Sequence, residues 1–267
     1  MELKPIIEVN NLHFSYKKNS VLKGINFQLQ KGDIISLLGP NGCGKSTLIR
    51  LILKLLKGNG DIFLYEKNLK EYSYKEIASK IAYIPQYNNT PFNYSVLDMV
   101  IMGRVSKLGF FAQPSQEDYD IANNALKKID IEHLSSKSFT ELSGGQKQMV
   151  LLARSIAQEV EIFIMDEPVA GLDYGNQIRL LELISELGSL GYTFLKTTHY
   201  PDHALLVSNR VVVMNNGVII SDGNPSSVIT KDMINEIYKI DAEIITHQYY
   251  KRCVPIFKQR SENKIAI

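Results

Sequence analysis

The sequence has only two cysteines, Cys43 and Cys253, which lie far apart among its 267 residues. Structural zinc sites and disulfide-stapled domains need more cysteines at short, regular spacings. We therefore expect two reduced thiols, with neither a disulfide framework nor a zinc site.

The chain also lacks long apolar runs and an excess of charge of one sign. The longest apolar runs, such as 150–153 and 211–214, fall far short of the roughly 20 residues that span a bilayer. Residues 1–10 contain charges and lack the apolar core of a secretory signal. Lys and Arg number 30 against 28 Asp and Glu, so no global field points to nucleic acid or anionic lipid. We expect a cytoplasmic protein that binds no nucleic acid and is not itself a channel.

The apolar residues are patterned as in an α/β protein. With 45% hydrophobic composition the chain can bury a substantial core. Alternating apolar residues at 6–9 and 25–29 predict two antiparallel strands at an edge, with turns at Gly24 and at 31–32. Short continuous apolar runs, some separated by helix-like stretches such as 177–187, are typical of a buried, mainly parallel sheet. These runs are residues 34–38, 81–84, 162–165, 193–195 and 211–214.

The pattern changes along the chain. Between Gln86 and Glu141 strand-like runs stop and helical patterns occur at 96–103 and 117–129, which predicts an inserted α-helical subdomain at about 87–158. We expect one domain over residues 1–240 and a C-terminal extension, 241–267, packed on it. A helix is predicted at 227–239 and a strand-like segment at 243–255.

A glycine-rich segment follows the apolar run 34–38. Gly39-Pro40-Asn41-Gly42-Cys43-Gly44-Lys45-Ser46 matches the phosphate-binding loop: glycine, four residues, glycine, lysine, then serine or threonine. The glycines let backbone N–H groups curl around phosphate oxygens, and a helix predicted at 46–56 turns its positive end to the same anion. Lys45 would reach the β- and γ-phosphates, and Ser46 would offer its hydroxyl to Mg²⁺. These residues and Thr47 are predicted to bind ATP.

Two carboxylates end the apolar run 162–165. Ligands of open α/β sheets bind at the carboxyl ends of the strands. We therefore expect Asp166 to hold Mg²⁺ and Glu167 to orient or deprotonate the attacking water. Acidic residues at the end of an apolar strand usually belong to just a solvated turn. The phosphate-binding segment in the same chain favours a catalytic role for this pair.

The most specific segment is Leu142-Ser143-Gly144-Gly145-Gln146. It resembles the signature of ATP-binding cassette (ABC) ATPases, and the order of elements resembles that family from residue 6 to about residue 225. The resemblance implies a phosphate-loop fold with a mainly parallel core sheet, an antiparallel β edge and an inserted helical subdomain. It also implies a head-to-tail homodimer, in which each signature contacts the ATP of the opposite subunit. Ser143 can cap a helix that begins near Gln146, and the glycines allow close approach to an anion.

The resemblance assigns further roles. Tyr16 is where the family stacks an aromatic ring on adenine, Gln86 matches a glutamine that senses Mg²⁺, and His199 matches a switch histidine at the γ-phosphate. The loop that crosses the dimer interface matches Ala170-Gly171-Leu172-Asp173. The catalytic candidates are thus Glu167, His199 and Gln86, and the Mg²⁺ candidates are Ser46, Gln86 and Asp166. His203, one helical turn after His199, is expected to be replaceable.

Two residues depart from the family pattern. Val169 stands where the family often has threonine, and Lys196 lies in a strand that is usually apolar. Neither is expected to touch the phosphates.

Because the chain has no span of its own, the resemblance implies a separate transmembrane permease dimer, reached at the cytoplasmic face of the plasma membrane, and indirectly a substrate-binding protein. Residues 87–104 resemble importers of iron-siderophore, haem and cobalamin complexes and are expected to form the docking surface, although an internally packed amphipathic helix is an alternative. Molybdate or tungstate import is the nearest rival. A non-transport cassette ATPase, as in iron–sulfur assembly, or a monomeric nucleotide kinase is a more distant one.

Overall fold

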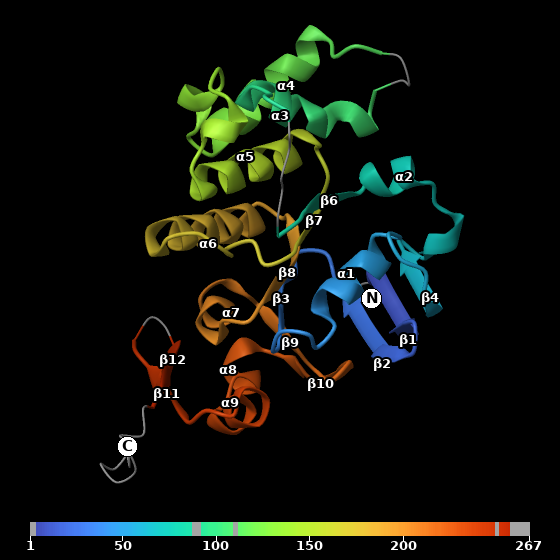
Figure 1. Ribbon diagram of the computed structural model, residues 1–267, viewed down its shortest axis with the longest axis vertical. Coiled ribbons are helices and arrows are strands. Elements are labelled where there is room, and N and C mark those ends of the chain that lie inside the picture. The colour runs from blue at the N-terminus through green and yellow to red at the C-terminus, as the bar shows by residue number, and fades with distance from the viewer. Residues whose placement is uncertain (1–3, 87–91, 109–111, 249–250, 257–267) are drawn as a thin grey trace, which may run out of the picture.

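The computed structural model describes residues 4–86, 92–108, 112–248 and 251–256. Its centre is a six-stranded sheet in which neighbouring strands are parallel, except for the β9–β10 hairpin (Figure 1). In spatial order the strands are β10 (Val218–Gly223), β9 (Arg210–Asn215), β3 (Ile34–Leu38), β8 (Thr193–Thr198), β7 (Ile162–Met165) and β6 (Ile81–Ile84). The α/β class and the mainly parallel core sheet are therefore confirmed.

The core strands are buried on both faces, which is why they read as continuous apolar runs. One face packs on α1 (Lys45–Ile52) and on an antiparallel sheet, with Leu37, Leu48 and Ile164 in one apolar cluster. The opposite face packs on α6 (Tyr174–Ser189), with Phe163, Phe194 and Ile184 in another cluster. α7 (Pro201–Val207) follows β8 and covers β3.

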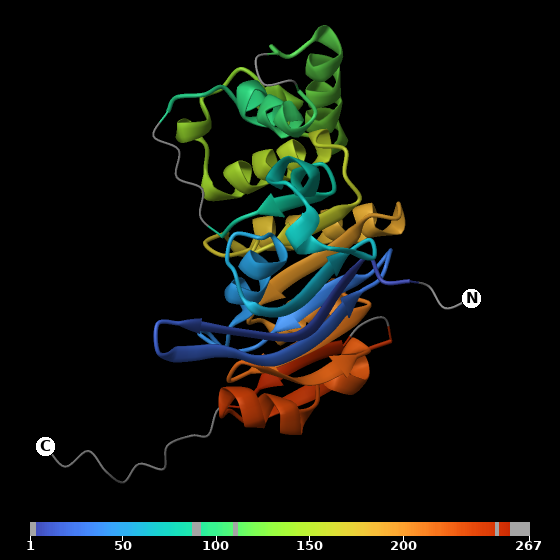
Figure 2. The ribbon, with the colours of Figure 1, turned by 90° about the vertical axis from the view of Figure 1, so that its right-hand side faces the viewer.

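The antiparallel sheet forms the edge of the molecule and lies in front of the core in Figure 2. Its order is β2 (Asn19–Leu29), β1 (Ile7–Tyr16), β4 (Asn59–Leu64) and β5 (Lys67–Asn68). The first two strands are longer than predicted, and Gly24 is not in a turn. Gly24 lies inside β2 at φ +82°, where the register with β1 shifts, so it forms a bulge that the alternating pattern conceals.

Helices cluster at the end of the molecule far from the C-terminal hairpin (Figure 1). α3 (Val96–Ile101), α4 (Gln116–Lys128) and α5 (Gly144–Ala157) pack on one another, joined by the 3₁₀ turns η2 (Met102–Ser106), η3 (Glu132–Leu134) and η4 (Phe139–Glu141). α2 (Tyr74–Ala78) and η1 (Leu69–Glu71) connect the antiparallel sheet to β6. An α-helical insertion is therefore confirmed as part of the fold, while residues 87–91 and 109–111 of its predicted span lie outside the described chain.

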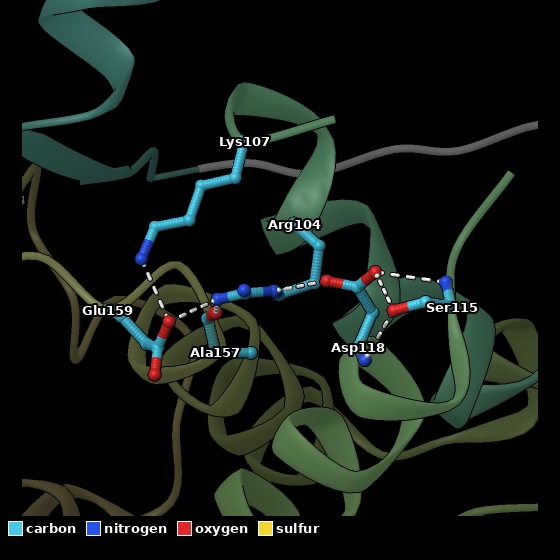
Figure 3. A network of polar contacts seen from close by, with 6 residues as sticks. All are labelled: Arg104, Lys107, Ser115, Asp118, Ala157 and Glu159. Atoms are coloured by element: carbon cyan, nitrogen blue, oxygen red, sulfur yellow. Dashed lines mark hydrogen bonds and ion pairs between the residues drawn. The ribbon is translucent and has the colours of Figure 1, made fainter. Parts of the chain in front are cut away.

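A buried charge network ties this cluster together (Figure 3). Arg104 is 6% exposed and donates to Asp118 (Nε–Oδ1 2.9 Å), to Glu159 (2.6 Å) and to the carbonyl of Ala157 (2.8 Å). The Arg104 guanidinium, together with Ser115, holds the pKa of the Asp118 carboxyl at about 2, so the pair stays ionised at neutral pH. Arg104 thus joins η2 to α4 and to the end of α5, and it faces inward.

The C-terminal part differs from its prediction. The expected helix at 227–239 is two helices, α8 (Pro225–Val228) and α9 (Lys231–Tyr238), because Ile229 and Thr230 are extended and Thr230 caps α9. The expected strand-like segment is a hairpin of β11 (Ala242–Thr246) and β12 (Lys251–Pro255), whose Cys253 N–H donates to Asp202 of α7 (2.6 Å). The expected helix at 46–56 ends at Ile52, because Lys54 has a left-handed φ of +59°.

The structure shows how β8 accommodates Lys196, which departs from the family pattern. It is 1% exposed in β8, and its ammonium donates to Ser36 Oγ (2.6 Å), which shares a hydrogen bond with Ser208 Oγ. No carboxylate pairs with it in the described ranges. Burial lowers the pKa of the Lys196 amine to about 7, against 10.5 for an ordinary lysine.

We expect Lys196→Met to change how stability depends on pH. Between pH 7 and about 10 the unfolded chain binds a proton at Lys196 that the folded chain does not, so the free energy of unfolding of the native protein rises with pH. The slope from this one group approaches about 1.4 kcal/mol per pH unit. Urea melts at pH 7, 8 and 9 should show a shallower rise for Lys196→Met and a more stable variant at pH 7. The exposed Lys137→Met should follow the native curve, and equal slopes in all three proteins would contradict the account.

Candidate active site

Four loops meet at one edge of the core sheet. β3, β6, β7 and β8 are parallel, so the residues after their carboxyl ends are neighbours in space. The glycine-rich loop follows β3, Gln86 follows β6, Asp166 and Glu167 follow β7, and His199 follows β8. The topology therefore gathers segments that are up to 160 residues apart in sequence.

The glycine-rich loop leads directly into α1. Gly42 and Gly44 have φ of +81° and +110°, which non-glycine residues adopt with strain, and Gly44 is the N-cap of α1. Gly39 lies so close to Met214 that a Cβ there would be 2.2 Å from the Met214 carbonyl oxygen. Lys45 is 5% exposed and donates to the carbonyls of Gly39 (2.7 Å) and Pro40 (3.1 Å), which curls the loop around its ammonium. The result is a fixed cradle of N–H groups and a lysine, suited to an anion.

Asp166 faces this cradle. It is 3% exposed, and its Oδ1 accepts hydrogen bonds from Ser46 Oγ (2.9 Å) and Thr197 Oγ1 (2.8 Å). The serine hydroxyl and the aspartate carboxylate, predicted from distant motifs, are therefore in direct contact.

The backbone of Glu167 is held in a left-handed conformation that residues other than glycine rarely adopt. Its φ is +46°, and its N–H donates to Thr197 Oγ1 (2.7 Å). One carboxylate oxygen accepts from Gln86 Nε2 (2.9 Å), and the other is 3.4 Å from His199 Nδ1, which makes no hydrogen bond of good geometry. The three catalytic candidates are thus brought together around one carboxylate.

A cavity of about 490 Å³ opens beside these groups. Tyr16, at the end of β1, lies at its mouth and is 43% exposed, with its ring edge-on to Phe14 (4.7 Å between centroids). A ring so placed is free to stack on a planar base. The cavity is lined by Tyr16, Val21, Asn41, Gly42, Gly44, Lys45, Ser46, Thr47, Gln86 and Glu167.

The signature segment lies elsewhere on the chain. Ser143 is the N-cap of α5 and forms a capping box with Gln146, so the helix begins at Gly144, earlier than predicted. A Cβ on Gly145 would lie 2.5 Å from the Asn176 side chain, so α5 and α6 pack closely there. None of residues 142–146 lines the cavity beside Lys45.

Residues 170–173 adjoin the signature. Gly171 has φ of +74°, its carbonyl oxygen lies 3.5 Å from where a Cβ on Gly144 would be, and Asp173 caps α6. Ala170 N–H donates to the Glu167 carbonyl (3.0 Å), which connects this loop to the catalytic carboxylate. Val169, which stands where the family often has threonine, is buried in the core and 4% exposed.

Comparison with known proteins decides the family. The family model described as ABC transporter matches residues 22–170. The chain belongs to this family.

Curated relatives and solved structures agree. The chain is 34% identical to the ferric enterobactin transport ATP-binding protein FepC of Escherichia coli, over 88% of this chain and 87% of FepC. It is 35% identical to the molybdate import ATP-binding protein MolC of Haemophilus influenzae, over 94% of this chain and 97% of MolC. A chain of an ABC transporter described as of the metal-chelate type, in an inward-facing conformation, superposes with a TM-score of 0.83 at 33% identity, covering 95% and 98% of the two chains. The fold, the nucleotide-binding function and the ATPase class are therefore those of an ABC transporter ATPase. No helix in the described ranges is long and apolar enough to cross a bilayer.

The donor set of this ABC ATPase fits Mg²⁺. The candidate ligands Ser46, Asp166 and Gln86 all offer oxygen, which is what Mg²⁺ takes. In the described ranges no group of three His, Cys, Asp or Glu side chains could hold a metal alone. This matches an ion that is bound by one or two protein oxygens together with phosphate and water.

Thr197 is a functional candidate that the sequence motifs did not reveal. Its hydroxyl donates to Asp166 and accepts from the N–H of Glu167, so one side chain fixes both carboxylates. Only its place near the end of β8, two residues after Leu195, where the predicted apolar run ends, could have signalled it.

His203, the expected replaceable histidine, is buried. It is 7% exposed, its ring lies 4.7 Å from that of Tyr200, and burial lowers its pKa to about 4. Its replacement is therefore expected to reduce stability. His203 does not line the cavity beside Lys45, so the prediction about turnover stays a prediction.

Proposed function

We propose that this chain is the ATP-hydrolysing subunit of an importer of a metal chelate, such as an iron–siderophore, haem or cobalamin complex. The observation that carries the proposal is the convergence of Lys45, Ser46, Asp166, Glu167, Gln86 and His199 at one sheet edge in a chain of the ABC family. The similarity to FepC and to the metal-chelate transporter favours a chelate as cargo. The similarity to MolC makes molybdate the second candidate.

In the proposed reaction the protein mainly positions groups and supplies charge. The loop 39–47 binds the phosphates, and the Lys45 ammonium turns from the carbonyls of Gly39 and Pro40 to the β- and γ-phosphates. Mg²⁺, held by Ser46 and Asp166 with Gln86 beside it, would neutralise charge on the phosphates. Glu167, fixed by Thr197 and Gln86, orients the attacking water and accepts its proton, and His199 contacts the γ-phosphate.

The ATP site is proposed to be completed by a second copy. The signature 142–146 and the loop 170–173 share one surface but lie outside the cavity of their own chain. A head-to-tail homodimer would apply the α5 N-terminus of each copy to the γ-phosphate on the other, where its N–H groups favour an anion.

The docking surface for the proposed permease was predicted at residues 87–104, part of which is buried. Residues 87–91 of the predicted segment lie outside the described chain, and six of the thirteen residues at 92–104 are buried. Among these six, Val96, Met99 and Val100 are core residues, and Arg104 lies in the charge network. A cavity of about 920 Å³ lies next to it, between α2 and the η2–α5 wall. Tyr74 and Val105 are 64% and 62% exposed at its rim, which is typical of surfaces that bind another protein. We therefore place the permease contact, at the cytoplasmic membrane face, in this groove.

Measuring uptake in cells of the source organism tests which cargo is imported. With Glu167→Gln at the native locus, import of a radiolabelled iron chelate, cobalamin or molybdate should fall to background for one cargo only. Loss of molybdate uptake alone would replace the chelate by the second candidate. Normal uptake of all three, with a tagged protein that recovers no membrane partner, would contradict a transport role.

The groove can be tested separately. Val105→Asp should abolish uptake and the recovery of a membrane partner, because a carboxylate would be buried without a partner in the apolar contact. The same substitution at the exposed Leu190, on the surface at the end of α6, is the control and should leave uptake intact. Full uptake by the Val105→Asp protein would place the permease elsewhere.

A further inference from the structure

A third cavity, of about 460 Å³, lies beside the end of α1 that is farther from the phosphate loop. Its apolar wall comes from β1, α1 and the segment after it, β4 and η1. The wall residues are Leu12, Leu51, Leu56, Ile62 and Leu69. It shares no lining residue with the ATP cavity and none with the groove assigned to the permease, so neither explains it.

The apolar wall is preformed. Leu12, Leu51 and Leu69 are 1%, 2% and 5% exposed and belong to the apolar cluster that also contains Leu37, Leu48 and Ile164, so the core holds them in place whether or not the cavity is filled. Cavities of about 300–1,000 Å³ with apolar walls and a few polar groups are typical of small-molecule sites. The volume and the wall therefore suit a small ligand with an apolar body.

The charged residues that line the cavity are all lysines. Lys54, Lys57 and Lys70 contribute to its lining, and no acidic residue does. The Lys54 ammonium is fixed by the carbonyls of Lys70 (2.9 Å) and Tyr72 (2.6 Å). Lys57 is exposed and makes no hydrogen bond or ion pair within the described ranges. The head group of a ligand would thus meet ammonium groups.

The nearest competing anion is Asp61, which is not among the lining residues. It pairs with Lys70 at 3.0 Å, but the two side chains are 51% and 70% exposed, and exposed pairs contribute little. Lys70 can therefore turn to a ligand at small cost.

We propose that this cavity binds a single-chain amphiphile with a carboxylate or phosphate head group. The chain lies along the wall of leucines and Ile62, and the head group lies at the mouth against Lys57 and Lys70. The site goes beyond the proposed function, because it uses neither ATP nor the permease groove.

Calorimetric titration of the full chain with decanoate and with decyl phosphate, below their micelle concentrations, tests the site. Both anions should bind saturably, one per chain, while decyltrimethylammonium, which has the same chain and the opposite charge, should not. Lys57→Glu should weaken decanoate binding about tenfold, as the loss of one charge-assisted contact implies. Leu56→Trp should abolish binding by filling the mouth, and Lys137→Glu, the same charge change on an exposed residue of the helical cluster, should leave it unchanged.

Three results would overturn the proposal: no saturable binding of either anion, equal binding of the cation, or the same affinity in Lys57→Glu as in the native chain. Lys57 is exposed, so its variant is expected to fold, and a thermal melt checks this. Sedimentation with vesicles that contain phosphatidylglycerol distinguishes a membrane lipid from a soluble acyl anion as the source of the head group. Pelleting that depends on Lys57 would indicate a membrane lipid, and binding of free decanoate without pelleting would indicate a soluble acyl anion; both support the site.

Discussion

Glu167→Gln is expected to lower steady-state ATP hydrolysis by about 100-fold or more, which is the usual contribution of a general base. The amide keeps the shape of the side chain and its contact with Gln86, but it cannot accept the proton of the attacking water. The φ of +46° at this residue and the hydrogen bond from its N–H to Thr197 belong to the backbone, so they should survive the substitution. ATP affinity should therefore stay within a few-fold of the native value. Phosphate release and equilibrium nucleotide binding measure the two quantities separately.

A matched control distinguishes the loss of a base from the loss of a charge. Glu182→Gln removes one carboxylate from the exposed side of α6 and should turn over ATP at the native rate. A Glu167→Gln protein that hydrolyses ATP at the native rate would remove Glu167 from the catalytic role.

Lys45→Ala is expected to weaken ATP binding itself. The Lys45 ammonium is buried in the loop, where among the described residues it donates to the carbonyls of Gly39 and Pro40, so it is positioned for phosphate oxygens. Charge-assisted hydrogen bonds contribute about 1.5–3 kcal/mol each, which corresponds to roughly a 10- to 150-fold loss of affinity. The loss should be larger for ATP than for adenosine, because the lysine contacts phosphate and not the base. Fluorescent-nucleotide titration gives both affinities.

The control for this prediction is Lys31→Ala, because Lys31 makes an exposed ion pair with Glu161 and precedes β3, whereas the loop follows that strand. It should bind ATP as the native chain does. Equal losses of affinity for ATP and adenosine in Lys45→Ala would show a damaged fold in place of a missing phosphate contact.

The core of the fold could be predicted because its signals are local and strong. Parallel strands that are buried on both faces read as continuous apolar runs, and these were located to within a few residues. The irregular positions at the edges of the fold were harder to predict. Gly24 sits in a bulge, and the break between α8 and α9 depends on the backbone of two ordinary residues, Ile229 and Thr230. Neither has a distinctive residue pattern.

The candidate site could be predicted where a motif has fixed spacing. The phosphate loop and the two carboxylates are motifs of this kind, and the structure brings Ser46 and Asp166 into contact. Thr197 could not be predicted in this way, because its role depends on β8 lying between β3 and β7, which is a property of topology.

Inward-facing charges were the least predictable. Arg104 lies at the end of a segment expected to be a docking surface, yet it is buried against Asp118 and Glu159, which are 14 and 55 residues away. Lys196 is buried beside Ser36, 160 residues away. Charged residues are mostly exposed, so a buried one is predicted to be exposed unless its partner, which is distant in sequence, is known.

Light scattering of the Glu167→Gln protein with and without MgATP tests the central claim most directly, that the signature of one copy completes the ATP site of another. The account predicts the mass of one chain without nucleotide and of two chains with it. It predicts a single chain in both conditions when Ser143→Arg is added, because the α5 N-terminus could then no longer approach the γ-phosphate. A Glu167→Gln protein that binds MgATP and stays a single chain, or a dimer that forms equally well with Ser143→Arg, would contradict it.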